Sequence, residues 1–269
     1  MSSLFKIIKN YNILPKYFLG QNFLLDQNII KKIIDSANIK QNSHVLEIGP
    51  GIGSLTKYIV KEFPRKVTLI EYDKQFSKIL DDYNDVDIIY DDVLKIDMSN
   101  IFSNQEDNII IANLPYYISS KILMKIFAIK NLSRFVIMIQ KEVGDKILSK
   151  HNQKSYGKLS VISQILYKIR KICDVNSASF YPRPKVTSSV LIFDYLQNNI
   201  CQYTIKNLLS ILKHSFAFRR KLLINNLESL NFPYILEIFD EMKIDQRNTR
   251  AENLSPSQYL DLANKISLY

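Results

Sequence analysis

The sequence predicts an α/β fold, in which a mainly parallel sheet with helices on both faces is followed by a small helical domain. Short apolar runs alternate with helical patterns up to residue 140, as in doubly wound sheets. From Gln197 the strand-like runs stop and helical patterns dominate. A length of 269 residues suits one large domain and one small one. The predicted domains are therefore residues 1–198 and 199–269, joined by the polar linker Gln197–Asn199.

The predicted strands are short apolar segments, most of them rich in Ile, Val and Leu. They are too short for buried helices, and polar or turn-forming residues bound most of them. The five that come first in the chain are separated by helical patterns, which indicates parallel pairing. The predicted strands are residues 44–48, 66–71, 86–90, 108–112, 133–140, 168–175 and 187–195.

The predicted helices follow apolar residues spaced three and four apart. Ser119–Lys130 shows this spacing at positions 122, 123, 126 and 127. Ser255 and Pro256 form a helix start signal, with Ser255 as the cap and Pro256 in the first turn. In the C-terminal region the predicted helices are residues 205–216, 219–230, 234–242 and 257–266.

A polar motif, Asn113-Leu114-Pro115-Tyr116, follows the apolar run at residues 109–112. Asn offers an acceptor and a donor, Pro fixes the backbone, and Tyr supplies a flat face for stacking. This combination suits the binding of an exocyclic amino group on a planar base. The alternative is a capped strand-to-helix turn without a ligand.

Other polar groups follow the preceding strands. Gly49-Pro50-Gly51-Ile52-Gly53 joins a strand to a helix, where glycines allow a close approach to a ligand and can present amide N–H groups. Glu71 ends the next strand and is placed to accept ribose hydroxyls. Asp91 and Asp92 follow the third strand, where a carboxylate can accept an adenine amino group. Ligands bind at this edge of open α/β sheets.

These motifs, in this order, resemble those of S-adenosylmethionine-dependent amino-methyltransferases. Three further segments narrow the similarity to the KsgA-like rRNA adenine N6,N6-dimethyltransferases, and the similarity runs from about Phe18 to Ala263. The resemblance implies a Rossmann-like methyltransferase sheet whose last strands complete the edge antiparallel. The three segments are Gly20–Asp26, Phe180–Val186 with Ser188, and Arg250–Ser255 with Gln258-Tyr259.

The resemblance also implies roles for individual residues. S-adenosylmethionine is expected to be held by Asn22, Leu24, Gly49, Gly51, Glu71, Asp92 and Asn113. The target adenine is expected to contact Asn113, Leu114, Tyr116 and Phe180, with the two rings stacking on its two faces. We expect no metal ion, because the three histidines and the two cysteines show no ligand spacing.

The charge distribution predicts a polyanion-binding surface. Residues 118–199 hold 14 Lys and Arg against 4 Asp and Glu, whereas residues 1–117 hold 13 against 15. Such an excess beside the predicted site fits RNA, although a Lys-rich composition could contribute to it. The predicted RNA contacts are Arg183, Lys185, Arg219, Arg220 and Lys221; the last three are expected to begin a helix, in which a solvated charged face is the alternative.

Two positions depart from the pattern of the family. Tyr117 stands where related sequences often have Asn, and is expected either to pack or to alter the rim of the base pocket. Phe218 stands where Gln or Gly often precedes the paired arginines, and an apolar ring there is expected to pack. Glu252 is expected to form a structural ion pair without a catalytic role.

The expected function is dimethylation of two adjacent adenosines in the 3′-terminal hairpin loop of small-subunit rRNA. The alternatives are a large-subunit rRNA methyltransferase of the antibiotic-resistance type, a non-catalytic assembly factor and a DNA adenine methyltransferase. The expected partner is small-subunit rRNA or the pre-30S subunit. Without a run of 18 apolar residues no membrane helix is expected, and two unpatterned cysteines suggest the reducing cytoplasm. No heptad pattern argues for a dimer, so we expect a monomer.

Overall fold

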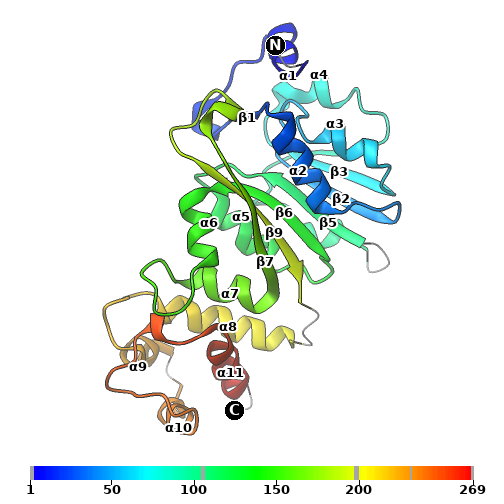
Figure 1. Cartoon of the computed structure of the whole chain (residues 1–269). Coiled ribbons are helices and arrows are strands. Elements are labelled where there is room, and N and C mark those ends of the chain that lie inside the picture. The colour runs from blue at the N-terminus through cyan, green and yellow to red at the C-terminus, as the bar shows by residue number, and fades with distance from the viewer. Residues whose placement is uncertain (1–2, 104–106, 197–199, 231, 268–269) are drawn as a thin grey trace. The chain divides into compact units, whose positions relative to one another are not determined.

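The computed structural model describes residues 3–103, 107–196, 200–230 and 232–267 (Figure 1). The chain forms two compact units, Met1–Gly144 with Ile169–Tyr195, and Asp145–Lys168 with Leu196–Tyr269. Both units are discontinuous, because the segment from Asp145 to Lys168 belongs with the C-terminal helices. The predicted boundary between residues 198 and 199 and the predicted linker lie outside the described residues, so this division into domains stays a prediction.

The main sheet has, among the described residues, seven strands in the order β4-β3-β2-β5-β6-β9-β7. The strands from β2 to β6 pair in parallel, and β9 pairs antiparallel with β6, as the resemblance implied. All seven predicted strands are confirmed, with ends that differ by at most one residue: β2 (Ser43–Ile48), β3 (Lys66–Glu71), β4 (Asp87–Tyr90), β5 (Asp107–Asn113), β6 (Arg134–Gln140), β7 (Tyr167–Val175) and β9 (Ser188–Tyr195).

The central strands are buried because helices cover the sheet. Every residue of β2 is buried, and its polar His44 is satisfied by Thr68 of β3, with Nε2 and Oγ1 2.8 Å apart. The parallel register aligns Ile48 with Ile70 and Ala112. The carboxyl ends of β2, β3 and β5 therefore meet at one edge, where the polar motifs follow.

Most helices of the first unit lie beside the strands of the sheet (Figure 1). Asp26 caps α2, because its Oδ1 accepts N–H bonds from Asn28 and Ile29 at 3.0 and 3.4 Å. α5 ends at Ile126 rather than the predicted Lys130, since Ala128 and Ile129 bond three residues back instead of four. The helices are α1 (Ser3–Asn10), α2 (Gln27–Ala37), α3 (Thr56–Ile59), α4 (Ser77–Leu80), α5 (Ser119–Ile126) and α6 (Lys141–Leu148), whose last four residues belong to the second unit.

Shorter elements connect them. β1 (Phe23–Leu24) and β8 (Phe180–Tyr181) form an antiparallel pair, in which Leu24 faces Phe180. Within the described parts of the chain, the 3-10 segments are η1 (Tyr17–Leu19), η2 (Val60–Glu62), η3 (Lys74–Phe76), η4 (Met98–Asn100), η5 (Ser177–Ser179), η6 (Glu228–Leu230) and η7 (Ala251–Asn253).

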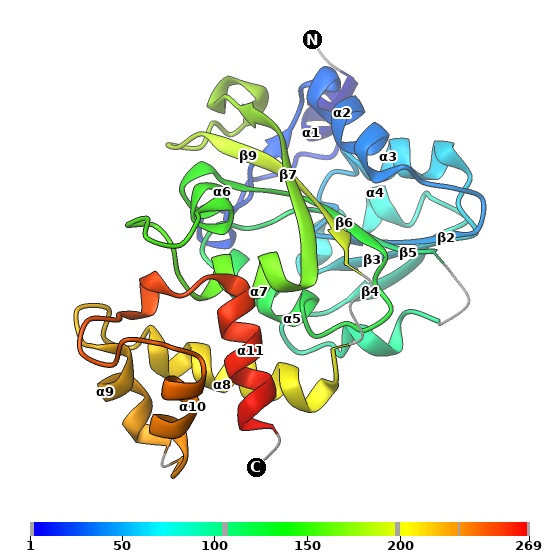
Figure 2. The ribbon, with the colours of Figure 1, turned by 60° about the horizontal axis from the view of Figure 1, so that its bottom comes forward.

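The second unit is helical. α11 packs against α7 and α8 (Figure 2). Two buried tyrosines lie in its core with satisfied hydroxyls: Tyr156 donates to the carbonyl of Leu254 at 3.0 Å and Tyr259 to that of Ala251 at 2.8 Å. Its helices are α7 (Lys158–Leu166), α8 (Gln202–Ser215), α9 (Leu223–Leu227), α10 (Ile235–Glu241) and α11 (Pro256–Ile266).

The predicted start of α11 is confirmed, because Ser255 Oγ accepts the N–H of Gln258 and Pro256 occupies the first turn. The predicted start of a helix at Arg219 is wrong, since α9 begins only at Leu223. Leu222 is extended, with a ψ of 149°, and forms a β-bridge with Arg250. Tertiary pairing therefore holds residues 219–222 outside the helix.

No helix among the described residues has the length and apolar character needed to cross a membrane.

Candidate active site

A cavity of about 310 Å³ opens at the carboxyl edge of the sheet, within the first unit. Its volume lies at the lower end of the range found for small-molecule sites. Every residue predicted to hold the cofactor lines it: Asn22, Leu24, Gly49, Gly51, Glu71, Asp92 and Asn113. Residues from five separate stretches of sequence thus converge on one space, which the alternative of an ordinary capped turn does not explain.

The glycine-rich turn brings bare backbone to the cavity. Gly49 has a φ of 69°, and a Cβ added there would meet no atom within 4 Å, so the backbone borders open space. The expected presentation of N–H groups to a ligand is wrong for three positions. Gly49 donates to the carbonyl of Ile70, Gly51 to Glu71 and Gly53 to the carbonyl of Pro50, each at 2.9 Å. These glycines therefore offer close approach rather than donors.

Glu71 is buried at the end of β3 and fixed at both oxygens. Its Oε2 accepts the N–H of Gly51 at 2.9 Å, and its Oε1 accepts that of Asp73 at 2.8 Å. Burial raises the pKa of Glu71, while these N–H groups oppose the rise. Each carboxylate oxygen keeps further acceptor capacity, so the carboxylate is held in place to accept hydroxyls.

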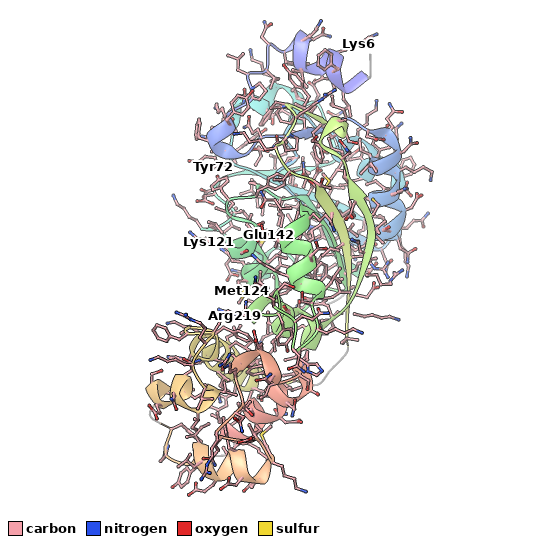
Figure 3. The ribbon with its side chains drawn as sticks, turned by 60° about the vertical axis from the view of Figure 1, so that its left-hand side comes forward. Lys6, Tyr72, Lys121, Met124, Glu142 and Arg219 are labelled. Carbon is pink, nitrogen blue, oxygen red and sulfur yellow. The ribbon has the colours of Figure 1, made fainter. Side chains whose placement is uncertain are left out.

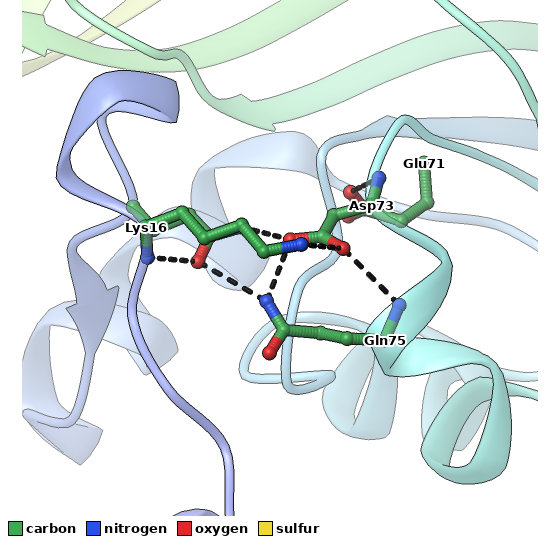
Figure 4. Close-up of polar contacts among 5 residues, drawn as sticks. Lys16, Glu71, Asp73 and Gln75 are labelled. Atoms are coloured by element: carbon green, nitrogen blue, oxygen red, sulfur yellow. Dashed lines mark hydrogen bonds and ion pairs between the residues drawn. The ribbon is translucent and has the colours of Figure 1, made fainter.

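A polar network behind Glu71 attaches the N-terminal segment to the sheet (Figure 4). The buried carboxylate of Asp73 accepts from Lys16 Nζ at 2.8 Å, Gln21 Nε2 at 2.7 Å and Gln75 Nε2 at 2.6 Å. Burial raises the pKa of Asp73, but the bonds from Lys16, Gln75 and Gln21 outweigh it and lower the pKa below its ordinary value. The network fixes the segment that carries Gly20, Gln21 and Asn22 along the cavity.

Sequence reasoning missed Glu47, which is buried in β2 and lines the cavity. Thr56 Oγ1 donates to its Oε2 at 2.6 Å. Burial raises the pKa of Glu47 to about 8, and the charge of Glu71 adds to the rise. The sequence did contain a signal for Glu47, because burying an acidic residue within the apolar run His44–Ile48 is unfavourable and therefore unusual. The neighbouring Ser54 also lines the cavity, and its buried Oγ has no protein hydrogen-bond partner among the described residues.

Asn113 is oriented by the backbone of the N-terminal motif. Its Nδ2 donates to the carbonyl oxygen of Asn22 at 2.9 Å, which leaves Oδ1 as the acceptor of this side chain. Leu114 is buried, and its N–H donates to the carbonyl of Met138 at 3.0 Å. The loop that begins at Asn113 is therefore anchored on both sides, to residue 22 and to β6.

Tyr116 is half-buried, and its hydroxyl lies 2.6 Å from Ser188 Oγ. Burial raises the pKa of Tyr116, while the bond to Ser188 opposes the rise. Ser188 belongs to the segment that the resemblance singled out. The contact joins the central motif to the start of β9.

Phe180 differs from the expected open ring. Its side chain is only 3% exposed, belongs to the hydrophobic core and does not line the cavity as described. The reason is the pairing of β8 with β1, which sets Phe180 opposite Leu24. The backbone of Phe180 is thus paired with Leu24, which lines the cavity, whereas the ring of Phe180 packs in the hydrophobic core. Stacking of this ring on a base stays a prediction.

Tyr117, the first departure from the family pattern, lies at the rim. It lines the cavity and is 59% exposed, and its ring carbon Cδ1 lies 3.5 Å from the position of a Cβ built on Gly20. Burial raises its pKa, and the charges of Asp92 and Tyr72 add to this. Figure 3 shows Tyr72 at the surface. Tyr117 is therefore not packed in the core, and its effect on the rim of the base pocket stays a prediction.

The predicted RNA-contacting residues are exposed in both units. Arg183 and Lys185 follow β8 in the first unit, and Arg219, Arg220 and Lys221 lie between α8 and α9 in the second; Figure 3 labels Arg219. Arg219 Nη2 lies 2.8 Å from Glu252 Oε2, which confirms the ion pair expected for Glu252. Phe218, expected to pack, is 61% exposed instead.

Among the residues that the structure describes, no group of three or more His, Cys, Asp and Glu is placed to hold a metal ion.

Known proteins resemble the chain over nearly its whole length. Residues 14–268 match the family described as ribosomal RNA adenine dimethylase. The chain is 39% identical to Ribosomal RNA small subunit methyltransferase A of Malacoplasma penetrans, over 95% of this chain and 93% of that protein. It is 38% identical to the protein of the same name from Bacillus mycoides, over 98% and 95%.

Two solved structures share the fold. A dimethyladenosine transferase from Plasmodium falciparum superposes with a TM-score of 0.76 at 26% identity, covering 91% of this chain and 98% of that one. The 23S rRNA methyltransferase ErmE superposes with a TM-score of 0.66 at 21% identity, covering 91% and 100%; at this identity the likeness concerns the fold alone. The family match and the relatives agree along the length of the chain, and this protein belongs to the ribosomal RNA adenine dimethylase family.

Proposed function

We propose that this protein transfers methyl groups from S-adenosylmethionine to N6 of adenosines in small-subunit rRNA, with N6,N6-dimethyladenosine as the product. The observation that carries the proposal is the convergence of the seven predicted cofactor residues on one cavity. The family match and the relatives named Ribosomal RNA small subunit methyltransferase A support the choice of adenine and of the small subunit.

The residues around the cavity fit the cofactor. Glu71 presents a fixed carboxylate to the ribose hydroxyls. Asp92, which follows the next strand, can accept a hydrogen bond from the adenine amino group. The backbone at Gly49 borders open space, so the methionine portion can approach it closely. The unpartnered hydroxyl of Ser54 offers a further polar contact. When bound, S-adenosylmethionine supplies a methyl group on a positively charged sulfonium.

Asn113 and Leu114 prepare the target nitrogen. The lone pair of adenine N6 is delocalised into the ring, so the nitrogen is a weak nucleophile. Asn113 Oδ1, which its amide anchor leaves as an acceptor, and the carbonyl oxygen of Leu114 can accept the two N6 hydrogens. That arrangement favours a pyramidal nitrogen whose lone pair points at the methyl group. Positioning and electrostatics then lower the barrier, without a strong general base.

The target base has to leave its stack to reach this site. Tyr116, held by Ser188, is proposed to stack on one face of the base, and Phe180 on the other. Arg183 and Lys185 are proposed to contact phosphates near this site, and Arg219, Arg220 and Lys221 to contact phosphates from the second unit. The 310 Å³ cavity receives the cofactor, and the base enters beside Asn113.

The finer parts of the proposal concern the natural substrate. We place the two methylated adenosines next to each other in the 3′-terminal hairpin loop, within a pre-30S subunit. The protein is proposed to act as a cytoplasmic monomer. Residues 1–198 are proposed to carry the chemistry and residues 199–269 to contribute RNA recognition.

The test is methyl transfer from labelled S-adenosylmethionine to small and to large ribosomal subunits that lack native adenine methylation, with the labelled nucleotide identified after digestion. The expected result is N6,N6-dimethyladenosine in small-subunit rRNA. Label confined to the large subunit would overturn the proposed substrate. Absence of label on both, with cofactor binding intact, would contradict the proposed reaction on ribosomal RNA.

A further inference from the structure

Phe218 is an exposed aromatic ring in a strongly basic stretch of the second unit. It is 61% exposed, and Arg219, Arg220 and Lys221 directly after it are exposed as well. An apolar ring that stays in water contributes nothing to the core, so burial does not explain its position. The ring is therefore accessible to a ligand, next to three basic residues.

The turn that carries Phe218 is held in place. Asn226 Nδ2 donates to the carbonyl oxygens of Ser215 and Phe218, at 2.9 and 3.0 Å. The N–H of Lys221 donates back to the carbonyl of Phe218 at 3.0 Å. The backbone of Phe218 thus has two hydrogen bonds at a single oxygen. A ring on such an anchored turn loses less conformational freedom on binding than one on a loose loop.

The three basic residues that follow Phe218 differ in their contacts. Arg219 is paired with Glu252 at 2.8 Å. Lys221 Nζ lies 4.8 Å from the centroid of the Phe218 ring, in a cation–π contact. Arg220 is exposed. An aromatic face bordered by cations matches a nucleotide, whose base is flat and whose phosphate is negative.

We propose that Phe218 stacks on an unpaired base of the RNA, while Arg220 and Lys221 contact the phosphates on either side of that base. The inference rests on the proposed function and adds to it a second point of contact, distinct from the target adenine. An unpaired base fits better than a duplex, because in a duplex both faces of each base are covered by its neighbours. Single-stranded loops and bulges are where proteins stack aromatic rings on bases.

The test compares Phe218→Leu, which removes the flat ring, with Phe218→Tyr, which keeps it. Tyr203→Leu is the matched control, because Tyr203 is 57% exposed in the same unit, on α8. Binding of a labelled single-stranded RNA and of the corresponding duplex is measured at low salt and over a salt series. Thermal unfolding of each variant checks that the fold is retained.

Phe218→Leu is expected to weaken binding of the single strand by roughly 10-fold, in the range known for stacking on one base. Binding of the duplex, and binding by Phe218→Tyr and Tyr203→Leu, should stay at the wild-type value. Salt distinguishes stacking from charge: Phe218→Leu should leave the slope of log K against log salt unchanged, whereas Lys221→Gln should reduce it by about 0.7.

Unchanged binding of the single strand by Phe218→Leu, an equal loss on single strand and duplex, or an equal loss in Tyr203→Leu would overturn the inference. A surface that binds an acidic peptide instead of RNA would give the first of these results. The proposed function is judged separately, by methyl transfer from the wild type to small subunits. Transfer with an unaffected Phe218→Leu variant rejects the stacking role alone, whereas absence of transfer rejects the proposed function.

Discussion

The side-chain amide of Asn113 is anchored to the main-chain carbonyl of Asn22, 2.9 Å away and 91 residues earlier in the chain. The bond uses the donor of the amide and leaves its oxygen as an acceptor. The N-terminal motif therefore sets the orientation of the residue that is proposed to hold the target nitrogen. One hydrogen bond thus connects the proposed cofactor pocket with the proposed site of the target nitrogen.

Asn113→Ala should reduce methyl transfer by roughly 100-fold or more, as expected for loss of one preorganised polar contact in the transition state. The cofactor keeps Glu71, Asp92 and the glycine turn, so its affinity should change only a few-fold. Single-turnover transfer to small subunits and calorimetric titration with S-adenosylhomocysteine measure the two quantities. Transfer at the wild-type rate would remove Asn113 from the mechanism.

Glu71→Ala should weaken binding of S-adenosylhomocysteine by roughly 10- to 100-fold, the effect of losing a charged hydrogen-bonding group. The variant removes the proposed ribose acceptor and also leaves the N–H groups of Gly51 and Asp73 without their partner. Glu62→Ala is the control, since Glu62 is an exposed acid of the same unit. Equal affinities in the two variants would show that Glu71 does not hold the cofactor.

Asp73→Ala should free the segment around Gln21 and Asn22, because three side chains lose a shared acceptor. We expect a loss of about 1–3 kcal/mol in the free energy of unfolding. Amides of residues 16–22 should exchange faster with solvent, and cofactor affinity should fall. Hydrogen exchange on the folded protein measures this locally. Unchanged protection of the segment would contradict the role of the network.

Glu47 should make stability depend on pH. Burial raises its pKa from 4.5 to about 8, so the folded protein keeps this proton at pH values where the unfolded chain has released it. The contribution of Glu47 to the free energy of unfolding is fully present below pH 4.5 and is lost as the pH rises through 8. Glu71, whose pKa is also raised, acts in the same direction.

Glu47→Gln has no proton to lose, so its free energy of unfolding should fall less than that of the wild type between pH 5 and pH 8. We expect the decrease in the free energy of unfolding over this range to differ by about 1–3 kcal/mol between the two proteins. Denaturant unfolding at several pH values measures it. Parallel curves for the two proteins would mean that Glu47 is ionised in the folded state.

Much of the sheet could be predicted, because Ile-rich runs such as residues 109–112 can only be buried strands at that length. The residues that follow each strand then had to meet at one edge, which placed Glu71, Asp92 and Asn113 together. The fold of the C-terminal region was predictable in kind, and the Ser255 cap in detail, since capping depends on neighbours in sequence.

Other features depend on contacts between distant residues. The local sequence around Asp73 does not indicate that Lys16, 57 residues away, is its partner. The burial of Phe180 follows from the pairing of β8 with β1, which no periodicity indicates. The helix expected from Arg219 is postponed by the bridge from Leu222 to Arg250. In each case the helical or polar character of a segment was visible, but its partner was not.

The short pairing of β1 with β8 makes two ligand contacts thermodynamically reciprocal. Leu24 of β1 lines the cofactor cavity, and Phe180 opposite it begins the segment that leads to Arg183 and Lys185. If cofactor binding orders this strand pair and thereby raises the affinity for RNA, then RNA held by that segment must raise the affinity for cofactor by the same factor. The order in which the two substrates bind then changes the rates of assembly of the complex, but not its free energy.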